Sequence, residues 1–428
     1  MRTSLQAIAN KAAKEKRHRF TNLATLLTEE NLADTWRMMN RSAAPGVDRR
    51  NAREYEGNLM ENIRDLVARL RGNRYRAKLI RRVHIPKGNG KTRPLGLPVT
   101  EDKLLQAAVS RILGSIYEAD FLPVSFGYRP GRGAQQAVGQ LDRELQFGKY
   151  AYIVEADIAG FFDNIDHRWL SRMIAHRVAD SALMRLVAKW LRAGVLETDG
   201  QVTHPLTGTP QGGVISPILS NIYLHYALDL WFEKVVKRHC RGEAYLCRYA
   251  DDFVCAFEHS DDAKRFHRAL SGRLGKFGLR LAPDKTRIIP FVRGNGGSAF
   301  EFLGFEFRWG VSRGGRPWLK RRTSRKKFRA SLHRLSEFCR EHRHLRLREF
   351  FELLNARLRG HYNYFGVIGN YRSLAEFHDR MEAVVFKWLN RRSQRKSFRW
   401  ATYKQVLRQH NLVQPRITEK RDMQLTLL

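Results

Sequence analysis

Two adjacent carboxylates, Asp251 and Asp252, are the residues of this sequence best suited to do chemistry. They lie in the segment 244–258, whose apolar residues predict two strands around a tight turn. Asp is common in turns for conformational reasons alone. A charged pair between bulky apolar strands is nevertheless costly unless the charge is used, and this favours a functional site at the tip of the hairpin.

A third carboxylate, Asp157, follows the short apolar run 152–154, which predicts another strand. If that strand neighbours the hairpin, Asp157 and Asp251 converge, with Asp252 alongside. Three carboxylates and the phosphates of a substrate suit two Mg²⁺ ions about 4 Å apart. One ion would lower the pKa of an attacking 3′-hydroxyl, and the other would hold a triphosphate. The pattern therefore predicts metal-assisted nucleotidyl transfer.

The segments around these carboxylates predict a mixture of helices and strands. Helices are expected within 1–68, with a break at 44–48, and at 101–118, 214–240 and 261–278, and strands within 69–100 and 286–308. The Gly88-Asn89-Gly90 sequence favours a hairpin turn. Beyond Arg308 the strand signals fade, helical periodicity takes over, and Lys and Arg far outnumber Asp and Glu. This change predicts a separate basic helical module.

The charge of the chain indicates a polyphosphate partner. The 428 residues include 78 Lys and Arg against 42 Asp and Glu, a net charge of +36. Each phosphate that such a protein neutralises releases counterions, and a ribosomal or chromatin-like binder would share this property. No apolar run approaches the roughly 18 residues of a membrane span, so no membrane partner is expected. The segment 1–20 is interpreted as a basic RNA-binding helix, with an organellar presequence as the alternative.

The four cysteines argue against a zinc site. Their spacing matches no zinc-ligand pattern, and free thiols in a reducing cytosol are expected. Without clustered Cys and His ligands near the C-terminal end, no zinc-bound nuclease module is expected either.

The segment Tyr249-Ala250-Asp251-Asp252 resembles the Tyr-X-Asp-Asp box of reverse transcriptases, and it does not stand alone. Further blocks resemble the motifs of that family in family order, at 85–98, 125–132, 155–167, 208–217, 278–286 and 302–305. Residues 44–48 resemble the extra N-terminal block of proteins encoded by group II introns. Residues 325–405 resemble their maturase-specific thumb. The sequence is identified as a member of this bacterial group, similar to compact class C relatives that lack the endonuclease.

The resemblance implies roles for five residues at the nucleotide site. Lys87 and Arg93 would contact the triphosphate of the incoming dNTP, Lys as a point charge and Arg as a fork for phosphate oxygens. Gln211 would lie near its sugar and base. Phe162 would exclude a ribose 2′-hydroxyl and so select dNTPs, although it could also be ordinary strand core. Lys285 would lie near the phosphates. For Lys87 and Arg93 the alternative is that both are merely solvated, as basic residues of a basic protein often are.

The resemblance also implies an RNA-binding surface on the thumb. Two basic runs lie beside aromatic side chains that can stack on bases. The candidate RNA-binding residues are Arg321, Arg322, Arg325, Lys326, Lys327, Arg391, Arg392, Arg395 and Lys396. The core of the thumb is expected at Leu353, Leu354, Leu358, Tyr362, Leu374, Phe377, Val384, Val385, Trp388 and Leu389.

Together these features predict an α+β fold, a right-hand polymerase with fingers, an antiparallel-sheet palm and an α-helical thumb. The expected domains are an N-terminal extension (1–68), fingers and palm (69–308), a thumb or maturase domain (309–405) and a basic tail (406–428). The expected partners are dNTPs, an RNA template with a DNA primer, target DNA and group II intron RNA, and the expected location is the bacterial cytoplasm at the nucleoid. The oligomeric state stays open.

Two alternative functions remain. One is a reverse transcriptase freed from its intron and recruited to DNA repair or phage defence. The other is a maturase that binds RNA for splicing without polymerising. The carboxylates Asp157, Asp251 and Asp252 are all present, which argues against the second alternative.

Overall fold

The computed structural model describes residues 4–88, 91–209, 212–294, 298–312, 314–392 and 397–420. These residues form an α+β fold with three β-sheets and a helical C-terminal region, as the sequence predicted. Within these ranges, no helix combines the length and the apolar composition that crossing a membrane requires.

The N-terminal region is helical and packs on one long buried helix. Its elements are α1 (Leu5–Lys14), the 3-10 helix η1 (Leu23–Leu26), α2 (Glu29–Met38), α3 (Ala52–Glu56), α4 (Leu59–Arg71) and α5 (Thr100–Tyr117). Helix α5 is the buried one, and α1, α2 and α3 contact it. Side-chain caps define the helix starts: Thr28 caps α2, and Asn51 forms a capping box with Glu54 at α3.

The predicted hairpin in the first third of the chain is present. Strands β1 (Ile80–Gly88) and β2 (Lys91–Leu97) pair antiparallel, with Ile85 opposite Arg93. The turn residues 89 and 90 lie outside the described residues. The sheet order is β2-β1-β4-β5, where β4 (Val195–Leu196) and β5 (Val202–Thr203) are two-residue strands.

The central sheet carries the acidic residues. It is formed by β3 (Tyr152–Asp157), β6 (Ala244–Tyr249), β7 (Asp252–Phe257) and β8 (Arg287–Pro290), in the order β6-β7-β3-β8 and entirely antiparallel. Helix α6 (Ala134–Phe147) packs on β6, and α11 (Ser260–Gly275) packs on β3, β7 and β8. The connecting helices are η2 (Phe161–Asp163), α7 (His167–Ala175), α8 (Ser181–Leu191) and η5 (Pro283–Lys285).

The long helix expected at 214–240 is present but is not a regular α-helix. It begins as α9 (Ser216–Leu224), with Pro217 in its first turn, where proline is well tolerated. It then passes through two π-helical turns, η3 (His225–Asp229) and η4 (Phe232–Val236), and ends as α10 (Lys237–His239). Such π turns are rare in proteins, but those that occur often lie at functional sites.

The expectation that strands end near residue 308 is wrong. A third sheet, of order β11-β10-β9, contains β9 (Ala299–Phe302), β10 (Phe305–Val311) and β11 (Pro317–Thr323). Strand β11 looked like a solvated basic run because it contains Lys320, Arg321 and Arg322. Its residues nevertheless alternate in burial, and Arg321 points inward, where acidic side chains neutralise it.

The C-terminal region is a helical bundle, as predicted. It contains α12 (Arg325–His342), α13 (Leu347–Phe365), α14 (Tyr371–Leu389) and α15 (Trp400–Gln409). Of the expected core residues, Leu354, Leu358, Tyr362, Leu374, Phe377, Val385 and Leu389 are buried, and Val384 and Trp388 are partly buried. Leu353 is 40% exposed, so its assignment to the core was wrong. It lies one position off the buried stripe of α13, which runs through Phe350, Leu354 and Leu358.

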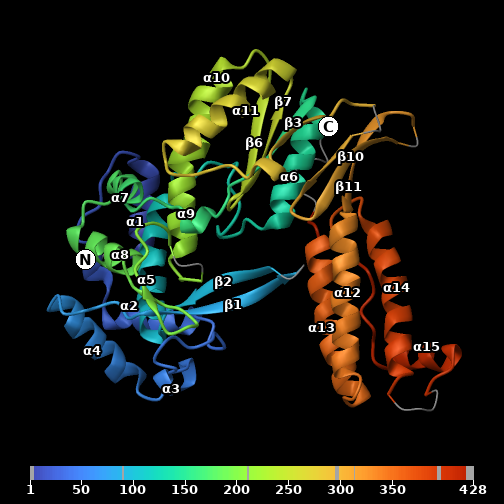
Figure 1. Ribbon diagram of the computed structural model, residues 1–428, viewed down its shortest axis with the longest axis horizontal. Coiled ribbons are helices and arrows are strands. Elements are labelled where there is room, and N and C mark those ends of the chain that lie inside the picture. The colour runs from blue at the N-terminus through green and yellow to red at the C-terminus, as the bar shows by residue number, and fades with distance from the viewer. Residues whose placement is uncertain are drawn as a thin grey trace.

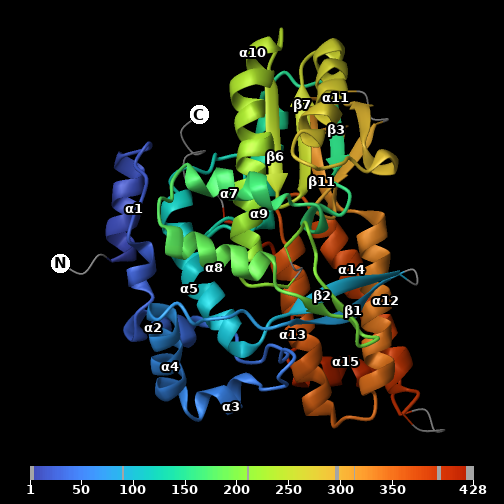
Figure 2. The same cartoon turned by 60° about the vertical axis from the view of Figure 1, so that its left-hand side comes forward.

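The three regions have the arrangement expected of fingers, palm and thumb. In Figure 1 the N-terminal helices lie on the left, the sheet with β3, β6 and β7 at the top, and α12, α13 and α14 on the right. The hairpin of β1 and β2 extends from the left toward α12 and α13 in both views (Figures 1 and 2).

The segment that follows α15 returns to the boundary between the bundle and the palm. The side chain of Asn355 in α13 bonds to the backbone of residues 410, 411 and 413. Further on, Glu419 accepts two hydrogen bonds from Arg321, at 2.9 and 3.1 Å, and one from the backbone N–H of Ile368 at 2.6 Å. Since Arg321 also lies 3.4 Å from Asp142 of α6, this segment links palm, third sheet and bundle.

Glu419→Gln is expected to lower the stability of the protein. The change removes the charge that faces the buried Arg321, which should cost about 1.5–3 kcal/mol. The matched control is Glu352→Gln, whose partner Arg348 is 87% exposed; an exposed pair is worth at most about 1 kcal/mol. Thermal denaturation of both variants measures the difference. Equal melting temperatures would show that the Arg321–Glu419 pair does not hold this boundary.

Candidate active site

The structure brings the three predicted carboxylates to one end of the central sheet. Strand β3 pairs antiparallel with β7, and Asp157 lies directly opposite Asp252. Asp251 occupies the turn between β6 and β7, after Ala250, whose φ of +56° is unusual for a residue with a side chain. The two strands are therefore neighbours, which the predicted convergence of the carboxylates required.

The three carboxylates influence one another electrostatically. Burial first, and then the charge of Asp157, raises the pKa of Asp251 above its ordinary value. The residue Asp252 is exposed. Its carboxyl group is nevertheless partly shielded from water, and this desolvation, followed by the charges of Asp251 and Asp157, raises its pKa to about 6. Negative charge that raises the pKa of Asp251 and Asp252 in this way favours a bound cation.

The ammonium group of a lysine provides part of the positive charge that these carboxylates favour. Lys285, in η5, is ion-paired with Asp157, and this hydrogen bond raises the pKa of Lys285. Lys285 also acts electrostatically on Asp251 and Asp252. The structure therefore places Lys285 beside the carboxylates, and its contact with the phosphates of a nucleotide stays a prediction. Within the described ranges, no three His, Cys, Asp or Glu side chains are already arranged as a metal cluster. The donor chemistry is all-carboxylate, which fits Mg²⁺.

The fingers hairpin contributes positive charge to the same place. Arg93 on β2 is exposed, and its charge opposes the rise in the pKa of Asp251. Lys87 lies on β1, and its side chain lies outside what the structure describes. The predicted hairpin position of both residues agrees with the fold.

Tyr128 is a residue of the site that the sequence reasoning missed. Its φ is +60°, and its ring is 54% exposed. Burial of its hydroxyl, and then the charge of Asp251, raise its pKa, while Arg93 lowers it. Tyr128 is therefore close enough to Arg93 of the fingers hairpin and to Asp251 to feel the charge of both. The signal in the sequence was its place directly after Gly127, in a block already recognised as a motif.

Phe162 lies in a tight turn directly beyond β3. This residue is half-buried in η2, and its ring contacts Phe161 edge-on at 5.3 Å between centroids. The segment that leads to residue 211 packs on this turn, because the N–H of Thr209 donates to the carbonyl of Phe162 at 2.7 Å. Phe162 is thus not part of a strand core. Gln211 itself lies outside the described residues.

The bundle approaches the carboxylates from the other side. Tyr364 of α13 donates a hydrogen bond to the carbonyl of Leu303 at 3.0 Å. Burial, followed by Tyr249 and Asp252, raises its pKa to about 12. Lys327, in the first turn of α12, lowers the pKa of Asp252. Residues of the palm, the fingers and the bundle therefore all interact electrostatically with one acidic site.

Comparison with known proteins decides the family. The model of the reverse transcriptase (RNA-dependent DNA polymerase) family matches residues 85–307, just over half of the chain. The chain belongs to the reverse transcriptase family. The model of the group II intron maturase-specific domain matches residues 325–406 of this reverse transcriptase.

Three relatives illustrate the similarity. The Escherichia coli protein YkfC is 33% identical over 331 residues, which cover 69% of this reverse transcriptase and 85% of YkfC. The group II intron-encoded protein LtrA of Lactococcus lactis is 45% identical over 166 residues, 39% of this chain and 27% of LtrA. The putative COX1/OXI3 intron 1 protein of Saccharomyces cerevisiae is 28% identical over 54% of this chain and 33% of its own length. The chain thus spans under two thirds of the two intron proteins.

The predicted RNA-binding residues of this reverse transcriptase divide into four groups. Arg325, Lys326, Lys327 and Arg391 are exposed, while Arg322 and Arg392 are half-buried. Arg395 and Lys396 lie outside the described residues. Arg321 is only 6% exposed and is paired with Glu419 and Asp142. Its assignment as an RNA contact is wrong, because its charge is already neutralised inside the protein.

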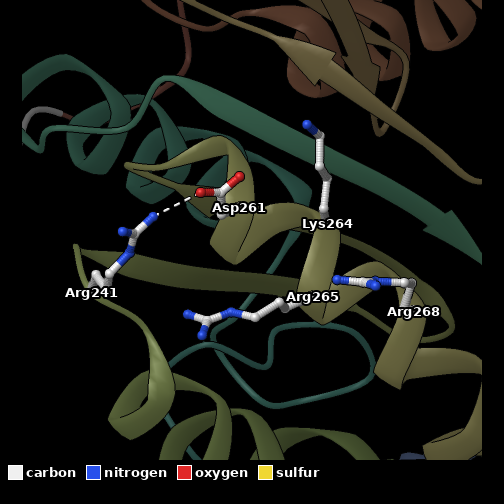
Figure 3. A pocket seen from close by; sticks show the side chains of 5 residues that line it. All are labelled: Arg241, Asp261, Lys264, Arg265 and Arg268. Carbon is white, nitrogen blue, oxygen red and sulfur yellow. Dashed lines mark hydrogen bonds and ion pairs between the residues drawn. The ribbon is translucent and has the colours of Figure 1, made fainter.

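A basic pocket lies away from the carboxylates, on the outer surface of the palm. A cavity of about 370 Å³ is lined by Arg241, Asp261, Lys264, Arg265 and Arg268 (Figure 3). Arg241 is paired with Asp261 at 2.8 Å, and Arg265 with the buried Asp262. The pocket adds positive charge to the back of this reverse transcriptase, and its single lining carboxylate cannot reproduce the chemistry of the triad.

Proposed function

We propose that this reverse transcriptase copies RNA into DNA by two-metal nucleotidyl transfer, with Asp157, Asp251 and Asp252 as the metal-binding residues. The observation that carries the proposal is the convergence of these carboxylates below a basic hairpin. When bound, Mg²⁺ would activate the primer 3′-hydroxyl and neutralise the triphosphate. A polymerase site of this kind needs no covalent nucleophile, because positioning and charge neutralisation suffice.

The remaining residues would bind and orient the nucleotide. Arg93 would clasp phosphate oxygens with its guanidinium fork, and Lys87 would add a second charge on the same hairpin. Lys285 would release Asp157 when the metal arrives and then face the phosphates. Phe162 would lie under the sugar, and Gln211 near the sugar and base. Each of these groups holds the substrate, and none takes part in bond making.

We further propose that the protein is encoded by a group II intron, binds the intron RNA to assist splicing, and acts in retrohoming. The match of residues 325–406 to the maturase-specific domain supports this. The exposed cations Arg325, Lys326, Lys327 and Arg391 are the proposed contacts with RNA. Arg391 lies 5.4 Å from the ring of Trp388, so a stacking ring and a charge are side by side.

Primer extension on an RNA template tests the polymerase. With Mg²⁺ and dNTPs, the protein is expected to extend a DNA primer. A chelator in excess should abolish extension, and added Mg²⁺ should restore it. An active-site variant that binds the same template–primer serves as the negative control. A folded protein that binds the template–primer but does not extend it would instead favour the alternative of a maturase that only assists splicing.

The raised pKa of Asp252 predicts a pH dependence of metal binding. Mg²⁺ requires the ionised carboxylate, so protons compete with the metal as the pH falls through about 6. Below that pH, the Mg²⁺ concentration for half-maximal activity should rise about tenfold per pH unit. Magnesium titrations at pH 5 to 8 measure this. A requirement that does not change with pH would remove Asp252 from the metal site.

A further inference from the structure

Arg248, the residue before the Tyr249–Asp252 box, is completely buried. Its guanidinium grips Asp229 with two hydrogen bonds, from Nε at 2.7 Å and from Nη2 at 2.6 Å, and neither side chain has exposed surface. Removing two charges from water costs several kcal/mol per ion, and an apolar pair of similar volume would often be no less stable. Stability alone is therefore a poor explanation for this ion pair.

The remaining donors of Arg248 reach the turn that carries the catalytic candidates. Nη1 donates to the carbonyl of Ala250 at 2.9 Å and to the side chain of Asn221 at 3.1 Å, and Nη2 donates to the hydroxyl of Ser125 at 2.7 Å. Ala250 is the residue with a φ of +56°. The guanidinium thus fixes the carbonyl of a strained turn residue, directly before Asp251.

The backbone of Arg248 is held as firmly as its side chain. Its N–H donates to the carbonyl of Val124 at 2.8 Å, and its own carbonyl accepts from the N–H of Phe126 at 2.9 Å. A side chain at Gly127 would lie 2.3 Å from the backbone nitrogen of Ala250. Only a glycine therefore allows this segment to pack so closely on the turn, and the turn is confined from two sides.

The anchor of Arg248 comes from the irregular helix. Asp229 is the last residue of the π-helical turn η3. The neighbouring His225 is buried, and burial lowers its pKa to about 4, so it adds no charge at neutral pH. Asp229 is thus the carboxylate that balances Arg248, and the π turn places it there.

We propose that the Arg248–Asp229 pair is a positioning device that sets the height and orientation of the turn carrying Asp251 and Asp252 for metal binding. This inference rests on the proposed polymerase function. Small displacements of reacting groups cost rate steeply, on the order of 10²-fold for 1 Å. A fixed buried pair behind the turn prevents such displacement without touching the substrate.

The test changes the pair without leaving an unpaired charge buried in the protein. Arg248→Met/Asp229→Leu keeps the volume and removes both ions, and Arg248→Lys keeps the charge but loses the fork to Ala250. The matched control is Arg177→Met/Asp120→Leu, a second Arg–Asp pair, 2.8 Å apart, with side chains 3% and 12% exposed and Arg177 bonded to the N-terminal segment. Each variant is assayed for kcat, for the KM of the dNTP, for template–primer affinity and for the rise in melting temperature on adding Mg²⁺.

The two Arg248 variants are expected to bind template–primer like the wild type. Their kcat should fall about 10- to 100-fold, the KM of the dNTP should change little, and several-fold more Mg²⁺ should be needed for the thermal shift. The control should match the wild type in all four. Wild-type kcat and Mg²⁺ requirement in either folded Arg248 variant, or an equal loss in the control, would overturn the inference. An inactive wild type would instead refute the proposed function.

Discussion

Asp251→Asn is expected to abolish DNA synthesis while leaving the binding of RNA intact. The change removes one negative charge at the tip of the β6–β7 hairpin and keeps the shape of the side chain. A neutral amide binds Mg²⁺ far less well than a carboxylate, so the ion that orients the nucleophile would be misplaced or lost. We expect kcat to fall by at least about 10³-fold, equivalent to about 4 kcal/mol of transition-state stabilisation.

The matched control for this experiment is Asp261→Asn, which makes the same chemical change in the basic pocket on α11. Asp261 is 66% exposed and paired with Arg241, far from the hairpin in the fold. Single-turnover primer extension measures the chemical step, and filter binding measures RNA affinity. Normal extension by Asp251→Asn would refute the assignment of the triad, and an equal loss in Asp261→Asn would point to a general effect of charge.

The sequence was sufficient to predict the local elements of this site and the order of its motifs. The hairpin and two of the carboxylates lie in one short segment. Apolar strands on either side of Asp251 and Asp252 have few interpretations other than a hairpin. The pairing of β3 with β7 could not be derived from spacing, because nearly a hundred residues separate the two strands. The resemblance to a family supplied that contact, and the register of Asp157 opposite Asp252 agrees with it.

The errors concern charged residues with hidden partners. Arg321 was expected to bind RNA because it stands in a basic run, yet its partners Asp142 and Glu419 are 179 and 98 positions away. Arg248 stands directly before a recognised motif and received no role for the same reason. Local patterns show which side chains carry charge, but burial and pairing depend on contacts between distant segments, and these decide whether a cation is free for phosphate.

The π-helical turns could not be predicted from sequence patterns either. An α-helical period fits residues 214–240 well enough to predict one helix, and the extra residue of a π turn changes that period only slightly. Its effect is nevertheless specific, because it brings Asp229 against Arg248. The position of the turn with Asp251 thus depends on an irregularity that periodicity conceals.

Phe162→Val is expected to let this reverse transcriptase incorporate ribonucleotides. The aromatic ring at the turn beyond β3 would occupy the space that a 2′-hydroxyl needs, and a smaller side chain would open it. Contacts of this size discriminate by about 10- to 200-fold in kcat/KM, so the preference for dNTPs should fall by a factor in that range. Single-nucleotide extension with each dNTP and its ribonucleotide measures the ratio.

Phe162→Tyr is the control, because it keeps the ring and should keep the discrimination. The template–primer affinity of both variants should equal that of the wild type, since Phe162 is proposed to contact only the sugar of the incoming nucleotide. If Phe162→Val still rejects ribonucleotides as strongly as the wild type, the gate lies elsewhere. Tyr128, which is half-exposed and interacts electrostatically with Arg93 and Asp251, would then be the next aromatic residue to replace.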